Sequence, residues 1–234
     1  MSTYRAPLRD MQFVLRELAG VEEIAKLPGY EDTTDVLDAI LEEASTFASE
    51  VLAPLNQSGD QEGCTWNDGV VTTPKGFKEA YHQFAKAGWI GLPVQAEYGG
   101  QGLPQIMLGP TLEMWNAANV GFANGPLLNQ GAIEAIEQFA SDEHKKTFIP
   151  KLVSGEWTGT MCLTEPQAGS DLAQVRATAA PEGDHYRVKG QKIFITFGEH
   201  DMAPNIIHLV LARLPDAPLG TKGISMFIVP KVLV

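Results

Sequence analysis

The stretch from Met161 to Asp171 carries the residue types with which a loop binds a polar ligand. It reads Met-Cys-Leu-Thr-Glu-Pro-Gln-Ala-Gly-Ser-Asp and follows a β-prone segment. The ring of Pro166 restricts the backbone at a bend, and Gly169 permits a close approach or a positive φ. The Ser170 hydroxyl and neighbouring N–H groups can donate hydrogen bonds to phosphate or carbonyl oxygens. These residue types allow a ligand-binding loop, although many purely structural strand-to-loop junctions have the same composition.

Other kinds of catalytic site have less support in the sequence. The histidines are scattered without metal-ligand spacing, so no metal site is expected. Cys162 lies on the predicted strand, where a buried small side chain is favoured over a reactive thiol. For Glu165, the acid within the loop, a structural or solvated role is favoured over that of a catalytic base. The Gly99–Gly102 segment lacks the flanking strand and helix of a dinucleotide-binding fingerprint, so a Rossmann fold is rejected.

The composition is that of an ordinary globular protein with an excess of acidic residues. Of 234 residues, 44% are hydrophobic and 20% charged, and 17 Lys and Arg against 29 Asp and Glu give a net charge of −12. This balance argues against nonspecific binding to nucleic acid or anionic lipid, which need a basic surface. Two cysteines are too few for a disulfide framework. With no apolar run as long as a signal peptide or membrane span, we expect a cytoplasmic protein.

The positions that could do chemistry follow a long helical region. Apolar residues recur at helical spacing from residue 6 to about 154. Pro54 and Gly59 are expected to end the second helix, and residues 56–73 are expected to form a loop because Gly, Asn, Asp and Ser dominate. The expected helices cover residues 11–18, 34–54, 74–87, 104–120, 127–140 and 142–153.

After Gly155 the pattern becomes strand-like. Expected strands cover residues 157–163, 175–179, 186–188, 193–196, 206–212 and 224–229. The second and third flank the Pro181–Asp184 turn as a hairpin, and residues 193–196 continue its second arm. Helices first and strands afterwards predict an α+β protein with segregated layers. The predicted domains are an N-terminal arm and linker (1–33), a helical domain (34–155) and a β domain (156–234).

Two motifs at a fixed spacing resemble the signatures of one enzyme family. Thr164-Glu-Pro166 followed by Ala168-Gly-Ser-Asp171 resembles the first signature of the acyl-CoA dehydrogenases, and Gly190-Gln-Lys-Ile-Phe-Ile-Thr196 resembles the second. The Gly88–Gly91 turn and the Tyr98–Gly102 segment also match the all-helical N-terminal domain of that family. The resemblance therefore spans nearly the whole chain.

Three further segments are similar to one subgroup of the family. They are the Tyr4–Met11 arm, the Gly29–Asp32 linker and the Gly198–Met202 segment. The subgroup includes the 3-methylmercaptopropionyl-CoA dehydrogenases of dimethylsulfoniopropionate breakdown and general fatty acyl-CoA dehydrogenases. The similarity implies a substrate of this class without choosing one acyl group.

The family resemblance implies a fold, a cofactor and a reaction. The fold is an N-terminal helical bundle followed by a β-barrel-like middle domain. The family removes a proton from the carbon α to a thioester and moves a hydride from the β carbon to FAD, which carries the redox chemistry. Reduced FAD then passes electrons to an electron-transferring flavoprotein. The implied partners are therefore an acyl-CoA, that flavoprotein and, at full length, further copies of the chain.

The resemblance also assigns cofactor-binding residues in the first motif. Met161, Leu163 and Thr164 would line the isoalloxazine ring, with Thr164 hydrogen-bonding its polar edge. Gly169 and Ser170 would meet the cofactor or the acyl-CoA, which makes Ser170 a candidate for substrate binding as well.

In the second motif, Phe194, Ile195 and Thr196 would cover the other side of the ring system, with Thr196 near the reactive nitrogen. The sequence departs from the family pattern here, because Phe194 stands where tryptophan is usual. A phenyl ring can still stack but covers less area than an indole. Gln167 replaces a common glycine and Phe197 a small or polar residue, and each substitution could change acyl specificity.

The family continues well beyond the length of this chain, which ends at Pro230-Lys-Val-Leu-Val234. Its C-terminal helical domain carries the general-base glutamate, FAD contacts to a neighbouring subunit and most of the oligomer interface. We therefore expect that domain to be absent, no catalytic residue to lie in this chain, and the isolated chain to be inactive. The chain would be a truncated product or would work beside a separate chain. A non-catalytic assembly subunit, and an acyl-CoA oxidase or flavin monooxygenase on the same scaffold, remain as alternatives.

Overall fold

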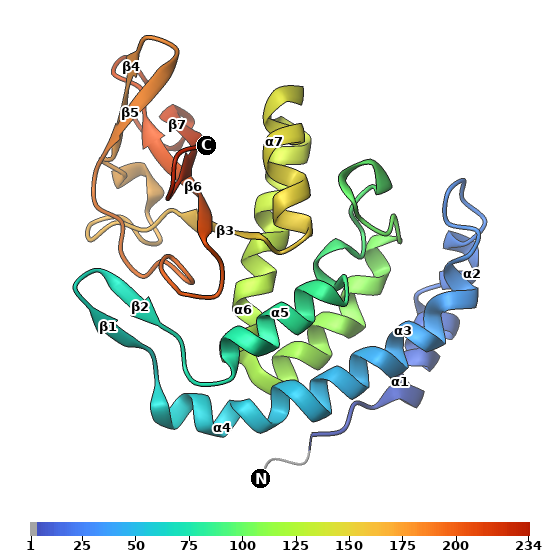
Figure 1. Cartoon of the computed structure of the whole chain (residues 1–234). Helices are drawn as coiled ribbons and strands as arrows, with labels where there is room; N and C mark the ends of the chain where they lie inside the picture. The colour runs from blue at the N-terminus through green and yellow to red at the C-terminus, as the bar shows by residue number, and fades with distance from the viewer. Residues whose placement is uncertain (1–3) are drawn as a thin grey trace.

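The computed structural model describes residues 4–234, so the first three residues of the predicted arm lie outside the described residues. Figure 1 shows the helices gathered on one side of the molecule and the main sheet on the other. Along the chain the large helices precede the strands of this sheet, which confirms the predicted α+β class.

The N-terminal region forms the expected first helix with an irregular end. Helix α1 (Leu8–Phe13) continues through a π-helical turn, Val14–Leu18, and buries Met11 and Leu15. Gly20 then takes a left-handed φ of 69° before the short helix α2 (Val21–Ile24). A glycine tolerates this backbone without a steric penalty, so the chain turns here as the sequence indicated.

The second helix is longer than predicted. Helix α3 (Thr33–Phe47) runs through a π-helical turn, Ala48–Leu52, into α4 (Ala53–Glu62). Pro54 does not stop it: it lies directly after the π-helical turn, as the second residue of α4. Gly59 does not stop it either: a Cβ there would come 2.5 Å from the Phe77 ring, so glycine allows close packing. The predicted helix end was therefore wrong.

A small hairpin replaces much of the predicted loop. Strands β1 (Thr65–Asn67) and β2 (Val70–Thr72) pair antiparallel. Asp68 and Gly69 have φ values of 47° and 84°, the left-handed backbone that a tight two-residue hairpin requires. Helix α5 (Phe77–Lys86) follows with an apolar face that is buried, as expected. Short 3-10 turns then occupy Trp89–Gly91, Ala96–Tyr98 and Gln105–Met107.

The two helices predicted for residues 104–140 form one broken helix, α6 (Leu108–Phe139). The break is at Asn119, whose φ of −161° and ψ of 87° are not helical. Its side-chain oxygen accepts a hydrogen bond from the Phe122 N–H (3.0 Å), and its amide nitrogen donates to the Leu52 carbonyl (3.2 Å). Asn119 therefore caps the second half of α6 and ties it to the neighbouring helix.

Replacing Asn119 by alanine should lower the free energy of unfolding by about 2 kcal/mol. The variant loses an N-terminal cap and leaves the buried Leu52 carbonyl without that donor. Urea unfolding followed by far-UV circular dichroism measures the change. Asn116→Ala is the matched control, since among residues 4–234 the Asn116 side chain bonds only within its own helix, to the Leu112 carbonyl. Equal stability of the two variants would contradict the capping role.

Helix α7 (Asp142–Val153) begins where the sequence predicted, with the Ser141 hydroxyl accepting from the His144 N–H (3.3 Å). Five strands then form the main sheet: β3 (Trp157–Cys162), β4 (Thr178–Glu182), β5 (His185–Lys189), β6 (Asn205–Arg213) and β7 (Ile224–Pro230). Strand β6 is the hub of the sheet: it pairs parallel with β3 and, at one residue, with β4, and antiparallel with β7, while β4 pairs with β5. The β4–β5 hairpin is confirmed, but residues 193–196 are not a strand.

Strands β3 and β6 share the main core with the helices, while Ala179 of β4 and Ala212 of β6 belong to a second, smaller cluster. Strand β3 packs on α6 so closely that a Cβ at Gly159 would lie 2.4 Å from the Ala132 Cβ. The Tyr81 hydroxyl of α5 donates to the Gly155 carbonyl (2.9 Å) just before β3. Ile207 of β6 belongs to the same buried cluster as the helix side chains. Within residues 4–234, no helix combines the length and apolar character needed to cross a membrane.

Candidate functional site

The loop after β3 is built around a tight turn. The backbones of Glu165 and Ala168 exchange two hydrogen bonds, of 2.9 and 3.0 Å. This turn leaves Pro166, Gly169 and Ser170 exposed, while Thr164 is half-buried at the end of the strand. Asp171 closes the loop by accepting from the Ala173 N–H (3.0 Å) at the start of a 3-10 turn, Leu172–Gln174.

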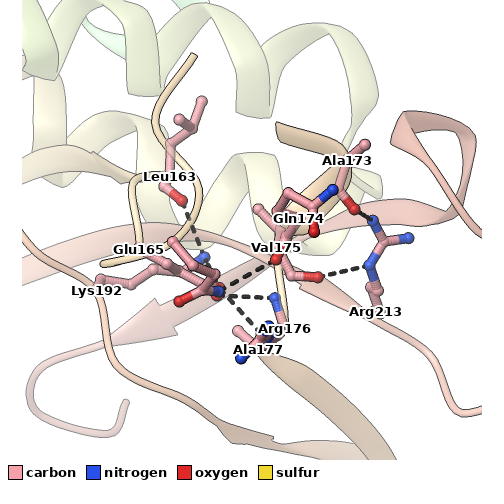
Figure 2. Close-up of polar contacts among 10 residues, drawn as sticks. Leu163, Glu165, Ala173, Gln174, Val175, Arg176, Ala177, Lys192 and Arg213 are labelled. Atoms are coloured by element: carbon pink, nitrogen blue, oxygen red, sulfur yellow. Dashed lines mark hydrogen bonds and ion pairs between the residues drawn. The ribbon is translucent and has the colours of Figure 1, made fainter. Parts of the chain in front are cut away.

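Glu165 is buried beneath this loop, with 4% of its surface exposed. Its carboxylate accepts from the Lys192 ammonium (2.8 Å) and from the N–H groups of Arg176 (2.8 Å) and Ala177 (3.0 Å), as Figure 2 shows. The Gln167 amide donates a further hydrogen bond of 2.5 Å. The carboxylate therefore organises the polypeptide around it, which is the structural role the sequence favoured.

Burial alone would raise the pKa of the Glu165 carboxyl. The hydrogen bonds outweigh burial, with that from Lys192 the largest among them, and lower the pKa to about 2. A carboxylate held ionised by four donors is a weak proton acceptor. Glu165 is therefore unsuited to the role of general base at neutral pH.

The two sequence motifs lie side by side, although they are far apart in the chain. The Ile193 N–H donates to the Thr164 carbonyl (2.9 Å), and the Lys192 ammonium donates to the Leu163 carbonyl (3.1 Å). The Thr160 hydroxyl of β3 donates to the Thr196 carbonyl (2.7 Å). We call residues 163–170 the first segment and residues 190–197 the second segment.

The second segment has an unusual backbone. Phe194 and Phe197 have φ values of 56° and 53°, in the left-handed region that bulky residues rarely adopt. The Phe197 ring packs against Gly125 of α6 and, edge to face, against His200 at 5.8 Å between ring centroids. The Phe194 ring instead is 90% exposed. Residues 193–196 therefore form a turn, and the strand predicted there was wrong.

The structure brings together the residues predicted to bind the cofactor, because both segments lie at the end of β3. Their exposure differs along each segment. The half-buried residues are Met161, Leu163, Thr164 and Ile195, and the exposed ones are Gly169, Ser170, Phe194 and Thr196.

Arg213 supports the far end of the loop and was not singled out from the sequence. Its guanidinium donates to the carbonyls of Val175 (2.7 Å), Ala173 (2.9 Å) and Pro218 (3.2 Å), the first two drawn in Figure 2. Five N–H donors in one plane allow a single arginine to serve several carbonyls. The one signal in the sequence for this carbonyl-binding role is that an arginine stands as the last residue of an apolar strand, β6.

A second buried polar group, His200, was also missed. Its Nδ1 accepts from the Met202 N–H (3.1 Å), so its Nε2 carries the hydrogen and donates to the Thr158 hydroxyl (2.9 Å). Burial lowers the pKa of His200 to about 4. Next to it, Asp201 accepts from the Thr73 hydroxyl (2.8 Å) and N–H (3.0 Å), which joins the chain just after the second segment to the residues that precede α5.

The remaining candidate groups have no arrangement suited to catalysis. Cys162 is buried, as expected; burial raises the pKa of its thiol to about 11, and its Sγ lies 3.6 Å from His208 Nδ1. Among the described residues no group of three or more His, Cys, Asp or Glu side chains could hold a metal ion. A cavity of about 350 Å³ does adjoin the second segment, between Phe197, Phe77 and Asn119, with the exposed Cys64 on its wall.

The arrangement of a helical bundle, a small sheet packed on it and two paired segments at the end of β3 is that of a known class of dehydrogenase domains. Residues 34–156 match the model for the acyl-CoA dehydrogenase N-terminal domain, and residues 160–233 match the model for the acyl-CoA dehydrogenase middle domain. The chain therefore belongs to the acyl-CoA dehydrogenase family, as the two motifs predicted.

Individual relatives agree with this assignment. The chain is 48% identical, over 99% of its length, to a 3-methylmercaptopropionyl-CoA dehydrogenase of Ruegeria pomeroyi, of which it covers 40%. Butyryl-CoA dehydrogenase of Megasphaera elsdenii has the same fold, with a TM-score of 0.69 and 27% identity over 84% of this chain and 49% of that one. The FAD complex of PigA gives a TM-score of 0.67 and 25% identity over 84% and 48%. The chain thus spans less than half the length of these relatives.

Proposed function

We propose that this chain forms the flavin-facing part of an FAD-dependent acyl-CoA dehydrogenase. Bound FAD would supply the hydride acceptor for α,β-dehydrogenation of an acyl-CoA thioester. In this proposal the first and second segments bind the isoalloxazine ring, with the Thr164 and Thr196 side chains toward its polar atoms. Support comes from family membership, from the FAD complex of the related PigA, and from the contacts that join the two segments.

The exposed ring of Phe194 is the observation that carries the proposal. A left-handed φ at a bulky residue costs of order 1–3 kcal/mol and persists only where the surroundings impose it. At Phe194 this backbone directs a phenyl ring that is 90% exposed, so packing within the described chain does not repay the cost. A flat aromatic ligand stacked on the ring would repay it.

Gly169 gives independent support for a ligand at the first segment. Its φ lies outside the left-handed region, and among the described residues no atom would lie within 4 Å of a Cβ added there. Neither backbone strain nor packing within the chain explains a glycine at this position. Close approach of a cofactor or of the acyl-CoA would explain it, and the exposed Ser170 hydroxyl beside it could then donate to that ligand.

The proposed substrate is 3-methylmercaptopropionyl-CoA or a fatty acyl-CoA. The Ruegeria pomeroyi relative, 48% identical over nearly the whole chain, is named for the first of these. Electrons would pass to an electron-transferring flavoprotein, and the complete enzyme would be a homo-oligomer. A panel of acyl-CoA thioesters with and without sulfur in the acyl chain distinguishes these substrates.

The general base is proposed to lie outside this chain. Among the described residues Glu165 is the one buried acid, and its four hydrogen bonds hold its pKa at about 2. The carboxylate is thus committed to the loop and is not available to accept the α proton. The chain by itself should bind FAD without turning over acyl-CoA.

Titration of the chain with FAD tests the proposal. Wild-type protein should bind FAD with a shift of the flavin absorbance. Thr164→Val combined with Thr196→Val should raise the FAD dissociation constant at least about tenfold, the loss expected for one good hydrogen bond to a charged or strongly polar group. Thr178→Val, at an exposed threonine of β4 in the same domain, is the control and should bind as the wild type does.

Two results would contradict the proposal. One is wild-type protein that leaves the FAD spectrum unchanged at millimolar concentrations. The other is unaltered affinity in the double threonine variant, which would remove both segments from the flavin site. Dye-linked oxidation of any acyl-CoA by the 234-residue chain alone would separately overturn the proposal that the base lies elsewhere.

A further inference from the structure

We propose that Lys192 is a positioning residue, which acts through Glu165 to hold the two flavin-facing segments in register. The expected effect on FAD binding rests on the proposed function, whereas the hydrogen bonds that join the two segments do not depend on it. Lys192 and Glu165 form an ion pair whose side chains are only 11% and 3% exposed. In the sequence, Glu165 precedes the β4–β5 hairpin and Lys192 follows it.

The Lys192 ammonium lies where two acceptors from the first segment converge. It donates to the Leu163 carbonyl at 3.1 Å and to the Glu165 carboxylate at 2.8 Å (Figure 2). Without a cation between them, a carbonyl oxygen and a buried carboxylate would face each other and repel. Loss of Lys192 should therefore move the first segment, and not merely remove one favourable contact.

Glu165 extends the effect of this pair to a third part of the chain. Its oxygens also accept the N–H groups of Arg176 and Ala177, directly before β4. One charge pair thus connects the end of β3, the start of β4 and the second segment. A buried pair of this kind is weak evidence for stability but can specify one arrangement over others.

The pair is adjacent to the groups proposed to meet the flavin. Lys192 precedes Phe194 by two residues, and Ile193 between them donates its N–H to the Thr164 carbonyl (2.9 Å). The Lys192–Glu165 ion pair and the Ile193–Thr164 hydrogen bond therefore fix the position of Phe194 relative to Thr164. A displacement of either segment would change the geometry on which flavin binding depends.

Lys192→Met tests the proposal with two measurements. The first is amide hydrogen exchange without FAD: exchange at Ile193, Arg176 and Ala177 should accelerate at least tenfold, while Ile207 in the core of β6 stays unchanged. The second is the FAD dissociation constant, which should rise at least tenfold although far-UV circular dichroism reports a folded protein. Lys192→Arg, which keeps the charge, should recover most of the affinity.

Arg187→Met is the matched control. Arg187 forms an exposed ion pair with Glu182 across the same hairpin, with bonds of 2.6 Å, and its loss should leave both measurements unchanged. If Lys192→Met does not fold, Glu165→Gln serves instead, because a neutral amide of the same size cannot accept all the donors that face it. It should also accelerate exchange at Arg176 and Ala177 and weaken FAD binding.

The outcomes separate this inference from the proposed function. Wild-type protein that binds no FAD would refute the function, while accelerated exchange in Lys192→Met would still support the positioning role. Conversely, wild-type protein that binds FAD, together with a Lys192→Met variant of equal affinity and equal amide exchange, would overturn the positioning role. A Lys192→Arg variant as weak as Lys192→Met would also overturn it, because the charge would then not be what matters.

Discussion

Gly159→Val is expected to lower the free energy of unfolding by about 3 kcal/mol, near the upper end for overpacking a core. Gly159 lies in the middle of β3, and even a Cβ there would come 2.4 Å from the Ala132 Cβ and 3.3 Å from the Asn129 side-chain oxygen. Both neighbours belong to α6, and the Ala132 Cβ is fixed to the helix backbone, so the strand and helix must separate. Urea unfolding of the variant measures the loss.

Gly131→Ala is the control for the change at Gly159. Gly131 is exposed on the same helix, and among the described residues nothing lies within 4 Å of a Cβ added there. Alanine should therefore stabilise the helix by up to about 1 kcal/mol. A valine at position 159 that leaves stability unchanged would show that β3 and α6 do not pack as described.

Acidification from pH 6.5 to pH 4 is expected to remove about 3 kcal/mol of stability through His200 alone. The pKa of this histidine is lowered from 6.5 to about 4 by burial. Between these values the unfolded chain binds a proton that the folded chain does not, so stability rises with pH. The contribution is complete above pH 6.5 and is lost as the pH falls toward 4.

The groups that face His200 modify this dependence without reversing it. Glu199 and Asp201 favour the protonated form, whereas Lys231 and His208 oppose it. Replacing His200 by asparagine should flatten the pH profile of unfolding between pH 4 and 6.5, although the variant is less stable at pH 7. Urea midpoints at pH 7, 5.5 and 4 test this, and parallel profiles for the two proteins would contradict the assignment.

The sequence predicted the regular elements better than the connections between them. Helix α5 has clear apolar periodicity and strands β6 and β7 are apolar runs, and the structure confirms all three. The predicted helix end at Pro54 and Gly59 was wrong. Pro54 follows a π-helical turn within the continuing helix, and Gly59 allows the helix to pack closely against Phe77. The β1–β2 hairpin lies within the region expected to be a loop, because the residues of its Asp68-Gly69 turn are also those typical of loops.

At the candidate site, the structure places the two motifs side by side, but the sequence did not indicate which side chains join them. Nothing local links Lys192 to Glu165, since the two residues lie 27 positions apart in the sequence, with the β4–β5 hairpin between them. The same holds for His200 and Thr158, and for Arg213 and Ala173. The strand expected over residues 193–196 is replaced by a turn with left-handed φ values at Phe194 and Phe197, a backbone that bulky residues disfavour and that no local pattern indicates. The individual roles in cofactor binding stay predictions.

The two cysteines differ in a way that offers a means of observing the site in solution. Cys64 is exposed on the wall of the cavity beside Phe197, whereas Cys162 is buried with its thiol pKa at about 11. An alkylating reagent should thus modify Cys64 alone in the folded protein, because only the thiolate reacts. A maleimide dye attached there would sit next to the second segment without any engineered mutation, and its emission would report on ligand arrival and on movement of that turn.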